Sequence, residues 1–96
     1  MTQAPQDNEA LQSLGRGASG LRGVVARVGH ETDDPEAIEL ERRLLEIGFV
    51  EGAKVEILHV GPIGGDPLAV KVDDARVAIR RREALSIMIR VEGGAR

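Results

Sequence analysis

The chain has 96 residues, with 13 basic and 16 acidic side chains and a formal net charge of −3. This length allows one small domain, which buries about two-thirds or less of the surface that its unfolded chain exposes. Because there is no cysteine, disulfides, thiolate metal sites and thiol catalysis are excluded. Phe49 is the single aromatic residue, and this scarcity together with the acidic balance argues against nucleic-acid binding.

The ends of the chain differ from its middle in composition. Residues 1–10 are polar and predict a disordered tail, residues 92–96 predict a flexible tail, and residues 11–91 predict the folded domain. No apolar run approaches the ~20 residues needed to cross a bilayer, and the start lacks the basic and apolar regions of a signal peptide. We therefore expect a soluble cytoplasmic protein.

The first predicted elements precede residue 30. Leu11 and Leu14 indicate one short helical turn before a group of glycines that permits tight bends. Residues 21–28, LRGVVARV, are rich in β-branched side chains and predict the first strand.

A helix is the clearest signal in the next segment. Asp34 is placed to cap its start, Pro35 occupies the first helical position, and Gly48 follows the last periodic residue. A broad apolar face is formed by Ala37, Ile38, Leu40, Leu44, Leu45 and Ile47. Glu41 falls inside that face, so we expect it at the rim or paired. Glu39 precedes Arg43 by four positions, which favours a surface ion pair.

The second half of the chain predicts four more strands. They are expected in residues 53–60, 67–72, 76–80 and 86–91, with a tight hairpin at 73–74 and one helical turn within 80–86. Five short strands with one helix indicate a small, strongly bent antiparallel barrel.

The stretch GPIGGDP, residues 61–67, could bind a phosphate, turn a hairpin or contact a partner. A phosphate-binding loop needs a Lys and a Ser or Thr leading into a helix, whereas Asp66 and Pro67 lead into a strand here. Two compatible interpretations remain. The glycines permit a hairpin connection in which Asp66 bonds nearby backbone amides, and the loop tip can contact a protein partner.

Other polar residues give weaker signals. His30, Glu31 and Asp33 are candidate ligands for weak binding of ferrous iron or another divalent metal, or are solvated side chains near a helix start. No required cofactor is expected. The basic run at residues 80–82 could meet an acidic partner, and at least one of its arginines is expected to be structural. Three serines and two histidines form no recognisable nucleophile–base arrangement, so we do not expect an enzyme.

The ordered set RRLLEIGFVEGAKVEI, GPIGGDPLAVKV and VAIRRREALSIMI resembles the FeoA family, small cytosolic proteins of bacterial ferrous iron uptake. The resemblance covers about residues 11–91. It implies a mainly β fold, an SH3-like antiparallel barrel of about five strands with one α-helix between the first two strands. The stretch GHETDDPEAIE is longer and more acidic than the family pattern, which leaves open what the loop before the helix does.

The resemblance also implies a role. It is that of an accessory protein that docks on the FeoB-type ferrous iron transporter, at its cytosolic GTP-binding part or its membrane part, and modulates transport. Such a protein would reach the membrane only through that partner, and it could form a homo-oligomer. The candidate partner-binding residues are Leu45, Gly48, Gly61, Pro62, Gly64, Gly65, Asp66 and Pro67.

Two alternatives stay open at this point. One is a metal-sensing or ligand-sensing regulatory domain, because the same barrel resembles the C-terminal domain of DtxR-type repressors. The other is an interaction domain unconnected to iron. Fold alone does not choose among these functions.

Overall fold

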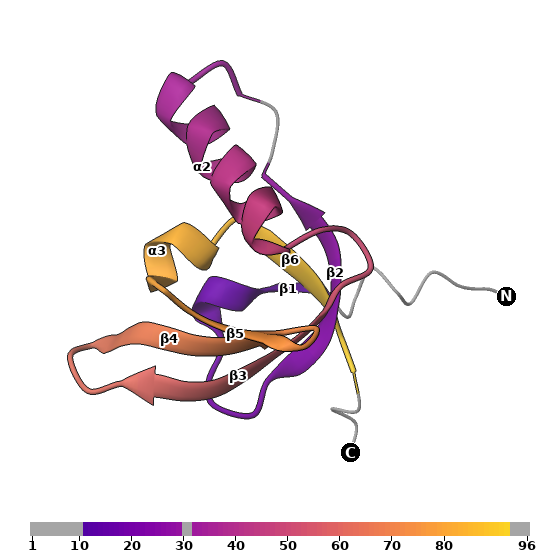
Figure 1. Cartoon of the computed structure of the whole chain (residues 1–96). Coiled ribbons are helices and arrows are strands. Elements are labelled where there is room, and N and C mark those ends of the chain that lie inside the picture. Colours follow the sequence, from indigo (N-terminus) through magenta and orange to yellow (C-terminus); the bar gives the residue numbers. More distant parts are fainter. Residues whose placement is uncertain (1–10, 30–31, 93–96) are drawn as a thin grey trace, which may run out of the picture.

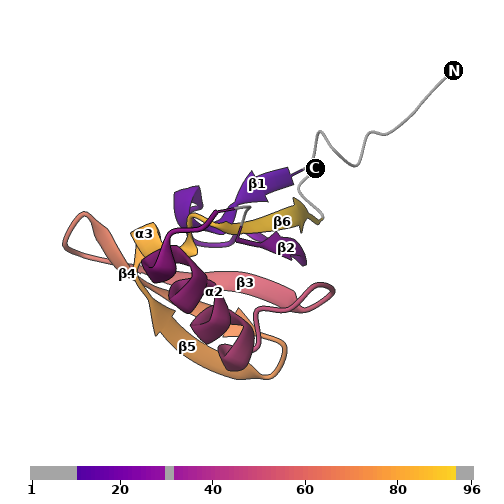
Figure 2. The ribbon, with the colours of Figure 1, turned by 90° about the horizontal axis from the view of Figure 1, so that it is seen from above.

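The computed structural model describes residues 11–29 and 32–92, and these form one antiparallel sheet (Figure 1). The strands are β1 (Leu11–Ser13), β2 (Arg22–Val28), β3 (Lys54–Gly61), β4 (Gly65–Val72), β5 (Ala75–Ile79) and β6 (Ile87–Val91). The helices are the 3-10 turn η1 (Leu14–Arg16), α2 (Pro35–Ile47) and the short α3 (Arg81–Ala84). The six strands lie in the order β1-β6-β2-β3-β4-β5. Figure 2 shows β1 and β5 at opposite edges, with α2 above the sheet.

The mainly β, antiparallel class is confirmed, but the strand count was too low. Residues Leu11–Ser13 form a strand that pairs with β6, where a helical turn had been expected, and the turn begins only at Leu14. Because of this added strand, α2 lies between the second and third strands and not between the first two. The reason is tertiary: pairing with β6 gives these three residues backbone partners that the local sequence cannot indicate.

The ends of α2 agree with the prediction. The Asp34 side chain accepts a hydrogen bond from the Glu36 amide at 3.1 Å, and Pro35 occupies the first turn. Gly48 ends the helix with a φ of 128°, a conformation that favours glycine. The helix therefore begins and ends at the positions that its capping residues predict.

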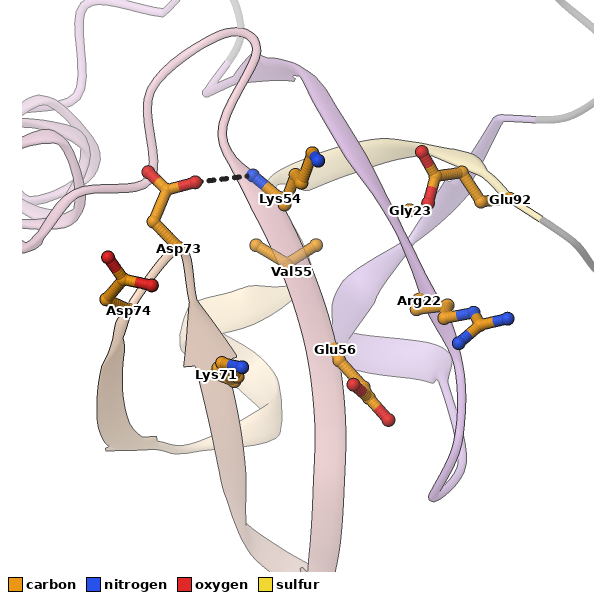
Figure 3. A pocket seen from close by; sticks show the side chains of 9 residues that line it. All are labelled: Arg22, Gly23, Lys54, Val55, Glu56, Lys71, Asp73, Asp74 and Glu92. Atoms are coloured by element: carbon orange, nitrogen blue, oxygen red, sulfur yellow. Dashed lines mark hydrogen bonds between the residues drawn. The ribbon is translucent and has the colours of Figure 1, made fainter.

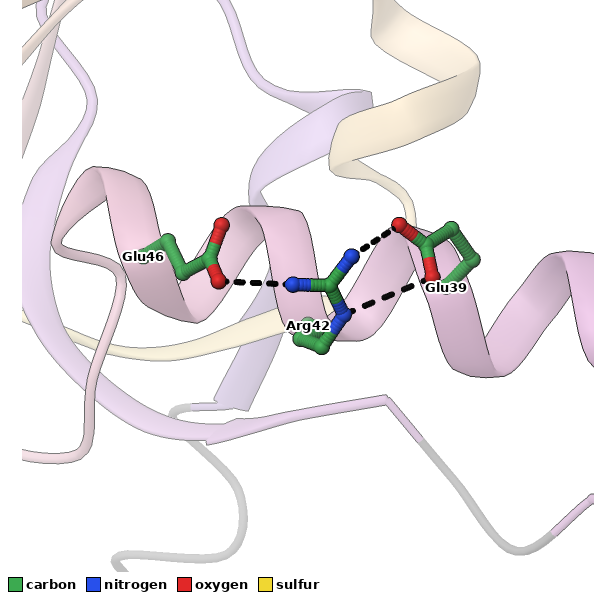
Figure 4. A network of polar contacts seen from close by, with 3 residues as sticks. All are labelled: Glu39, Arg42 and Glu46. Atoms are coloured by element: carbon green, nitrogen blue, oxygen red, sulfur yellow. Dashed lines mark hydrogen bonds and ion pairs between the residues drawn. The ribbon is translucent and has the colours of Figure 1, made fainter.

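On the charged face of α2, Glu39 and Arg43 do not form the ion pair that the sequence predicted, so this prediction was wrong. Arg42 forms an ion pair with Glu39, and the Nη1 atom of Arg42 lies 2.7 Å from Oε2 of Glu46 (Figure 4). The hydrogen bond to Glu39, followed by the charges of Glu39 and Glu46, raises the pKa of the Arg42 guanidinium. Arg43 instead reaches Glu83 of α3, at 3.5 Å. Since the Arg42 network is solvent-exposed, it contributes little to stability.

The core is aliphatic around one aromatic ring, that of Phe49, which is fully buried. The largest buried side chains are Phe49, Leu14, Leu44, Ile57, Leu68, Ile87, Ile89, Val25 and Val70. Only Leu44 of α2 belongs to this set, so the helix covers the core with a narrow part of its apolar face.

Arg81 joins three segments at one end of the barrel. Its Nε donates to the Gly65 carbonyl at 3.0 Å, and its Nη1 donates to the carbonyls of Gly15 and Gly17 at 3.1 and 2.8 Å. The Arg81 amide donates to Asp66 Oδ1 at 2.7 Å. The expectation that one arginine of the basic run is structural is confirmed, because this guanidinium links η1, α3 and the start of β4.

Arg81→Met should destabilise the fold by about 1–3 kcal/mol, because it keeps the stem but leaves three carbonyls without their donor. Urea denaturation followed by circular dichroism measures this change. Arg82→Met is the matched control, since Arg82 is the exposed neighbour and its loss should cost less than about 0.5 kcal/mol. Equal stability of the two variants would contradict the cross-linking role.

Candidate functional site

The GPIGGDP stretch forms the end of the β3–β4 hairpin, which projects from the barrel in Figure 1; Gly61 ends β3, and β4 begins at Gly65. Gly64 and Gly65 have φ values of 66° and 82°, and these confirm the hairpin interpretation of the glycines. A Cβ atom on Gly61 would collide with the backbone carbonyl of Asp66, so the two strands approach too closely there for any larger residue. At the tip the Ile63 side chain is 79% exposed.

Asp66 has a different role from the one expected. Its carboxylate accepts from the distant Arg81 amide at the start of α3, and not from amides of its own loop. The residue is half-buried, so it holds the hairpin against α3 and is not a freely exposed contact residue. Ile63 is the side chain that this hairpin presents to solvent.

The predicted partner-binding residues fall into two groups that the fold keeps apart. Gly48 lies next to the Val72 side chain, at the end of β4, and Leu45 belongs to the same end of α2. The hairpin residues lie at the beginning of β4, which starts at Gly65. A strand of this length spans about 23 Å at ~3.3 Å per residue, so one small contact cannot include both groups.

The hairpin group borders an open depression of about 580 Å³. We name it the hairpin depression, and it is lined by Ile63, Asp66, Pro67, Ala78, Ile79, Arg80 and Glu83. Of the predicted partner-binding residues, it includes Asp66 and Pro67.

A second hollow lies between α2, the end of β2 and the residues that follow α3. This α2–α3 groove has a volume of about 260 Å³ and is lined by Gly29, Thr32, Ala37, Leu40, Glu41, Arg82, Leu85 and Ser86. Leu40 and Leu85 supply apolar surface, while Glu41 and Arg82 contribute opposite charges. The Arg43–Glu83 ion pair also connects α2 to α3.

Sequence reasoning missed this groove, although one signal was present. Glu41 interrupts the apolar face of α2, and the prediction that it lies at a rim agrees with its half-buried position. Nothing in the local sequence placed Leu85 opposite Leu40, because long-range contacts position α3, among them the bonds of Arg81 to the segment after β1 and the Arg43–Glu83 ion pair.

More apolar surface of α2 remains uncovered beside the groove. Ile38 and Leu45, seven positions apart, share one side of the helix and are 50% and 40% exposed. Ile47 and Val50 are also exposed at the end of the helix. The predicted apolar face is therefore real but wider than the barrel beneath it.

Another hollow, of about 680 Å³, has mixed charge (Figure 3). Its lining residues are Arg22, Gly23, Lys54, Val55, Glu56, Lys71, Asp73, Asp74 and Glu92. Asp73 Oδ1 already accepts a hydrogen bond from the Lys54 amide at 3.0 Å. Three basic and four acidic side chains line this hollow. Its electrostatic potential therefore has no single sign that would attract a charged ligand.

The candidate metal ligands are not assembled in the part of the chain that the structure describes. Within residues 11–29 and 32–92, no three His, Asp or Glu side chains lie close enough together to hold a metal ion. Asp33 is exposed before α2, and His30 and Glu31 lie outside the described residues. Across the same ranges, no helix has both the length and the apolar character that crossing a bilayer requires.

Comparison with known proteins identifies the fold. A family model described as the FeoA domain matches residues 12–91. FeoA of Stenotrophomonas maltophilia, solved with zinc and described as an SH3 domain protein, is 33% identical over 81% of this chain and 88% of its own, with a TM-score of 0.67. FeoA of Chlorobium tepidum is 30% identical over 88% of this chain and 74% of its own, with a TM-score of 0.71.

A manganese-dependent transcriptional repressor shares the fold alone. It is 23% identical, with a TM-score of 0.68, and the match covers 84% of this chain but 41% of the repressor. A comparison with curated protein sequences found no match. The family model spans most of the described sheet, and the two FeoA structures share its SH3-like architecture. The chain therefore belongs to the FeoA domain family.

Proposed function

We propose that this protein is an accessory of bacterial ferrous iron uptake that docks on the FeoB-type transporter and modulates transport. The observation that carries the proposal is the FeoA domain match over residues 12–91. It is supported by the S. maltophilia relative, which has been described as a candidate ferrous iron transport activating factor. A role without catalysis agrees with the absence of a nucleophile–base arrangement among the sequence motifs.

The α2–α3 groove is the docking surface that the geometry favours. It presents the apolar side chains of Leu40 and Leu85 in a concave site, where burial of one apolar partner side chain excludes water most effectively. Glu41 and Arg82 belong to the same site, so a transporter segment with an apolar side chain flanked by a basic and an acidic residue would complement it. The hairpin depression is more open, and Ile63 is the one large apolar side chain among its lining residues that is exposed.

Leu85→Glu should weaken binding to the purified cytosolic GTP-binding domain of the transporter from the same cell by about tenfold or more, because it places a charge in the apolar part of the groove. Isothermal titration calorimetry with GDP and with a GTP analogue measures the affinity in each nucleotide state. Val60→Glu is the matched control, since Val60 is 39% exposed on β3 and Leu85 is 43% exposed.

Ile63→Glu distinguishes the two surfaces in the same titration. Loss of binding in this variant, with Leu85→Glu unaffected, would transfer the docking surface to the β3–β4 hairpin. If the folded wild-type protein binds neither this domain in any nucleotide state nor the whole transporter in detergent, the accessory proposal is wrong.

Titration with ferrous or manganous ion tests the metal-sensing alternative separately. The accessory role predicts no micromolar metal site, because the described carboxylates and imidazole are not clustered. A micromolar site that disappears in the His30→Ala variant would favour a sensor, and Asp73→Ala, a change remote from the loop before α2, would serve as the control.

A further inference from the structure

The edge of the sheet formed by β5 is unusually suited to pairing with another strand. Among the described residues β5 pairs with β4 and with no other strand, and Figure 2 shows it along the outer margin of the sheet. Its pairing with β4 is regular over five residue pairs, whereas the β2–β6 and β3–β4 pairings contain register shifts. It contains no proline, so neither a bulge nor a missing amide protects this edge.

The opposite edge differs in this respect. β1 has three residues and turns directly into η1, which leaves little backbone for a further ladder. β5 has five residues, and every second one directs its N–H and C=O away from β4. The backbone alone therefore makes β5 the better template.

The residues around β5 specify what can pair with it. The segment DDARVAIRR places exposed Asp74 just before the strand and exposed Arg80 just after it. If a second copy of β5 pairs antiparallel about a two-fold axis at Val77, Asp74 of each copy lies opposite Arg80 of the other. Arg76 then lies opposite Ala78, whose small side chain leaves room for the guanidinium.

Neighbouring registers are unfavourable. An axis at Arg76 would place Arg76 opposite itself, and an axis at Ala78 would place Arg76 opposite Arg80. Like charges directly opposite each other destabilise a strand pair, and a two-fold axis perpendicular to the sheet allows only registers centred on a residue. The register centred on Val77 also brings partly exposed Val77 side chains together on the inner face.

We propose that β5 is a homodimerisation edge, where two copies of this chain pair antiparallel with Val77 at the centre and Asp74 opposite Arg80 of the second copy. The proposal rests on the strand edge and its charges, and it is independent of the proposed transporter docking. The α2–α3 groove does not include β5, so the dimer would leave both grooves open.

Sedimentation velocity between about 1 μM and about 1 mM, a range that spans weak dissociation constants, should show a species of twice the 10.3 kDa chain mass. Asp74→Lys and Arg80→Glu, each alone, should weaken this dimer by about tenfold, because the two-fold axis converts both ion pairs into like-charge pairs. Arg82→Glu, an exposed change outside β5, should leave dimerisation unchanged.

Mixing the two reversed variants is the decisive arm of the experiment. A heterodimer of Asp74→Lys with Arg80→Glu has opposite charges at both positions, so it should form where each variant alone stays monomeric. Circular dichroism checks that both variants fold. A wild-type protein that is monomeric throughout the range, a dimer insensitive to both reversals, or a mixture that does not reassociate would each overturn the proposal.

Discussion

The guanidinium of Arg81 is the constraint on which the surface of this small barrel depends. It binds carbonyls of the segment after β1 and of the first residue of β4, while the amide of the same residue is held by Asp66. Close approach is part of this arrangement, because a Cβ atom on Gly15 would lie 2.5 Å from the Arg81 carbonyl oxygen. The β3–β4 hairpin, η1 and α3 are therefore held as one unit, and the position of α3 decides that a groove exists beside α2.

The apolar face of α2 is wider than the part of it that the core buries. The core has room for Leu44, whereas the apolar face of the helix extends to Ile38 and Leu45 on one side and to Ile47 on the other. Apolar side chains left exposed near a concave site are a common feature of interaction surfaces. In this fold they accompany a cleft whose opposite wall, Leu85, is provided by the segment that Arg81 positions.

Charge has separate uses in different parts of the molecule. On α2 the exposed network of Arg42 with Glu39 and Glu46 stays within one helix, whereas Arg43 crosses to Glu83 and connects two helices. Around β5 the charges sit at the two ends of a regular edge strand, where they can discriminate between registers. Arg80, Arg81 and Arg82 are adjacent in sequence, but one borders the hairpin depression, one cross-links the barrel and one lines the groove.

Local chemistry made much of the fold predictable from the sequence alone. Asp34, Pro35 and Gly48 determined the helix ends through capping and backbone preference, and alternation of apolar residues determined the strands from β2 to β6. The glycines of the β3–β4 connection likewise identified a hairpin, because their positive φ values are a local requirement. Only the tertiary structure decided that Leu11–Ser13 is a strand, that Asp66 bonds Arg81, and that Leu85 faces the groove with Leu40. Each of these depends on partners between 15 and about 80 positions away in the chain, and such long-range contacts leave no periodic or capping signal in the local sequence.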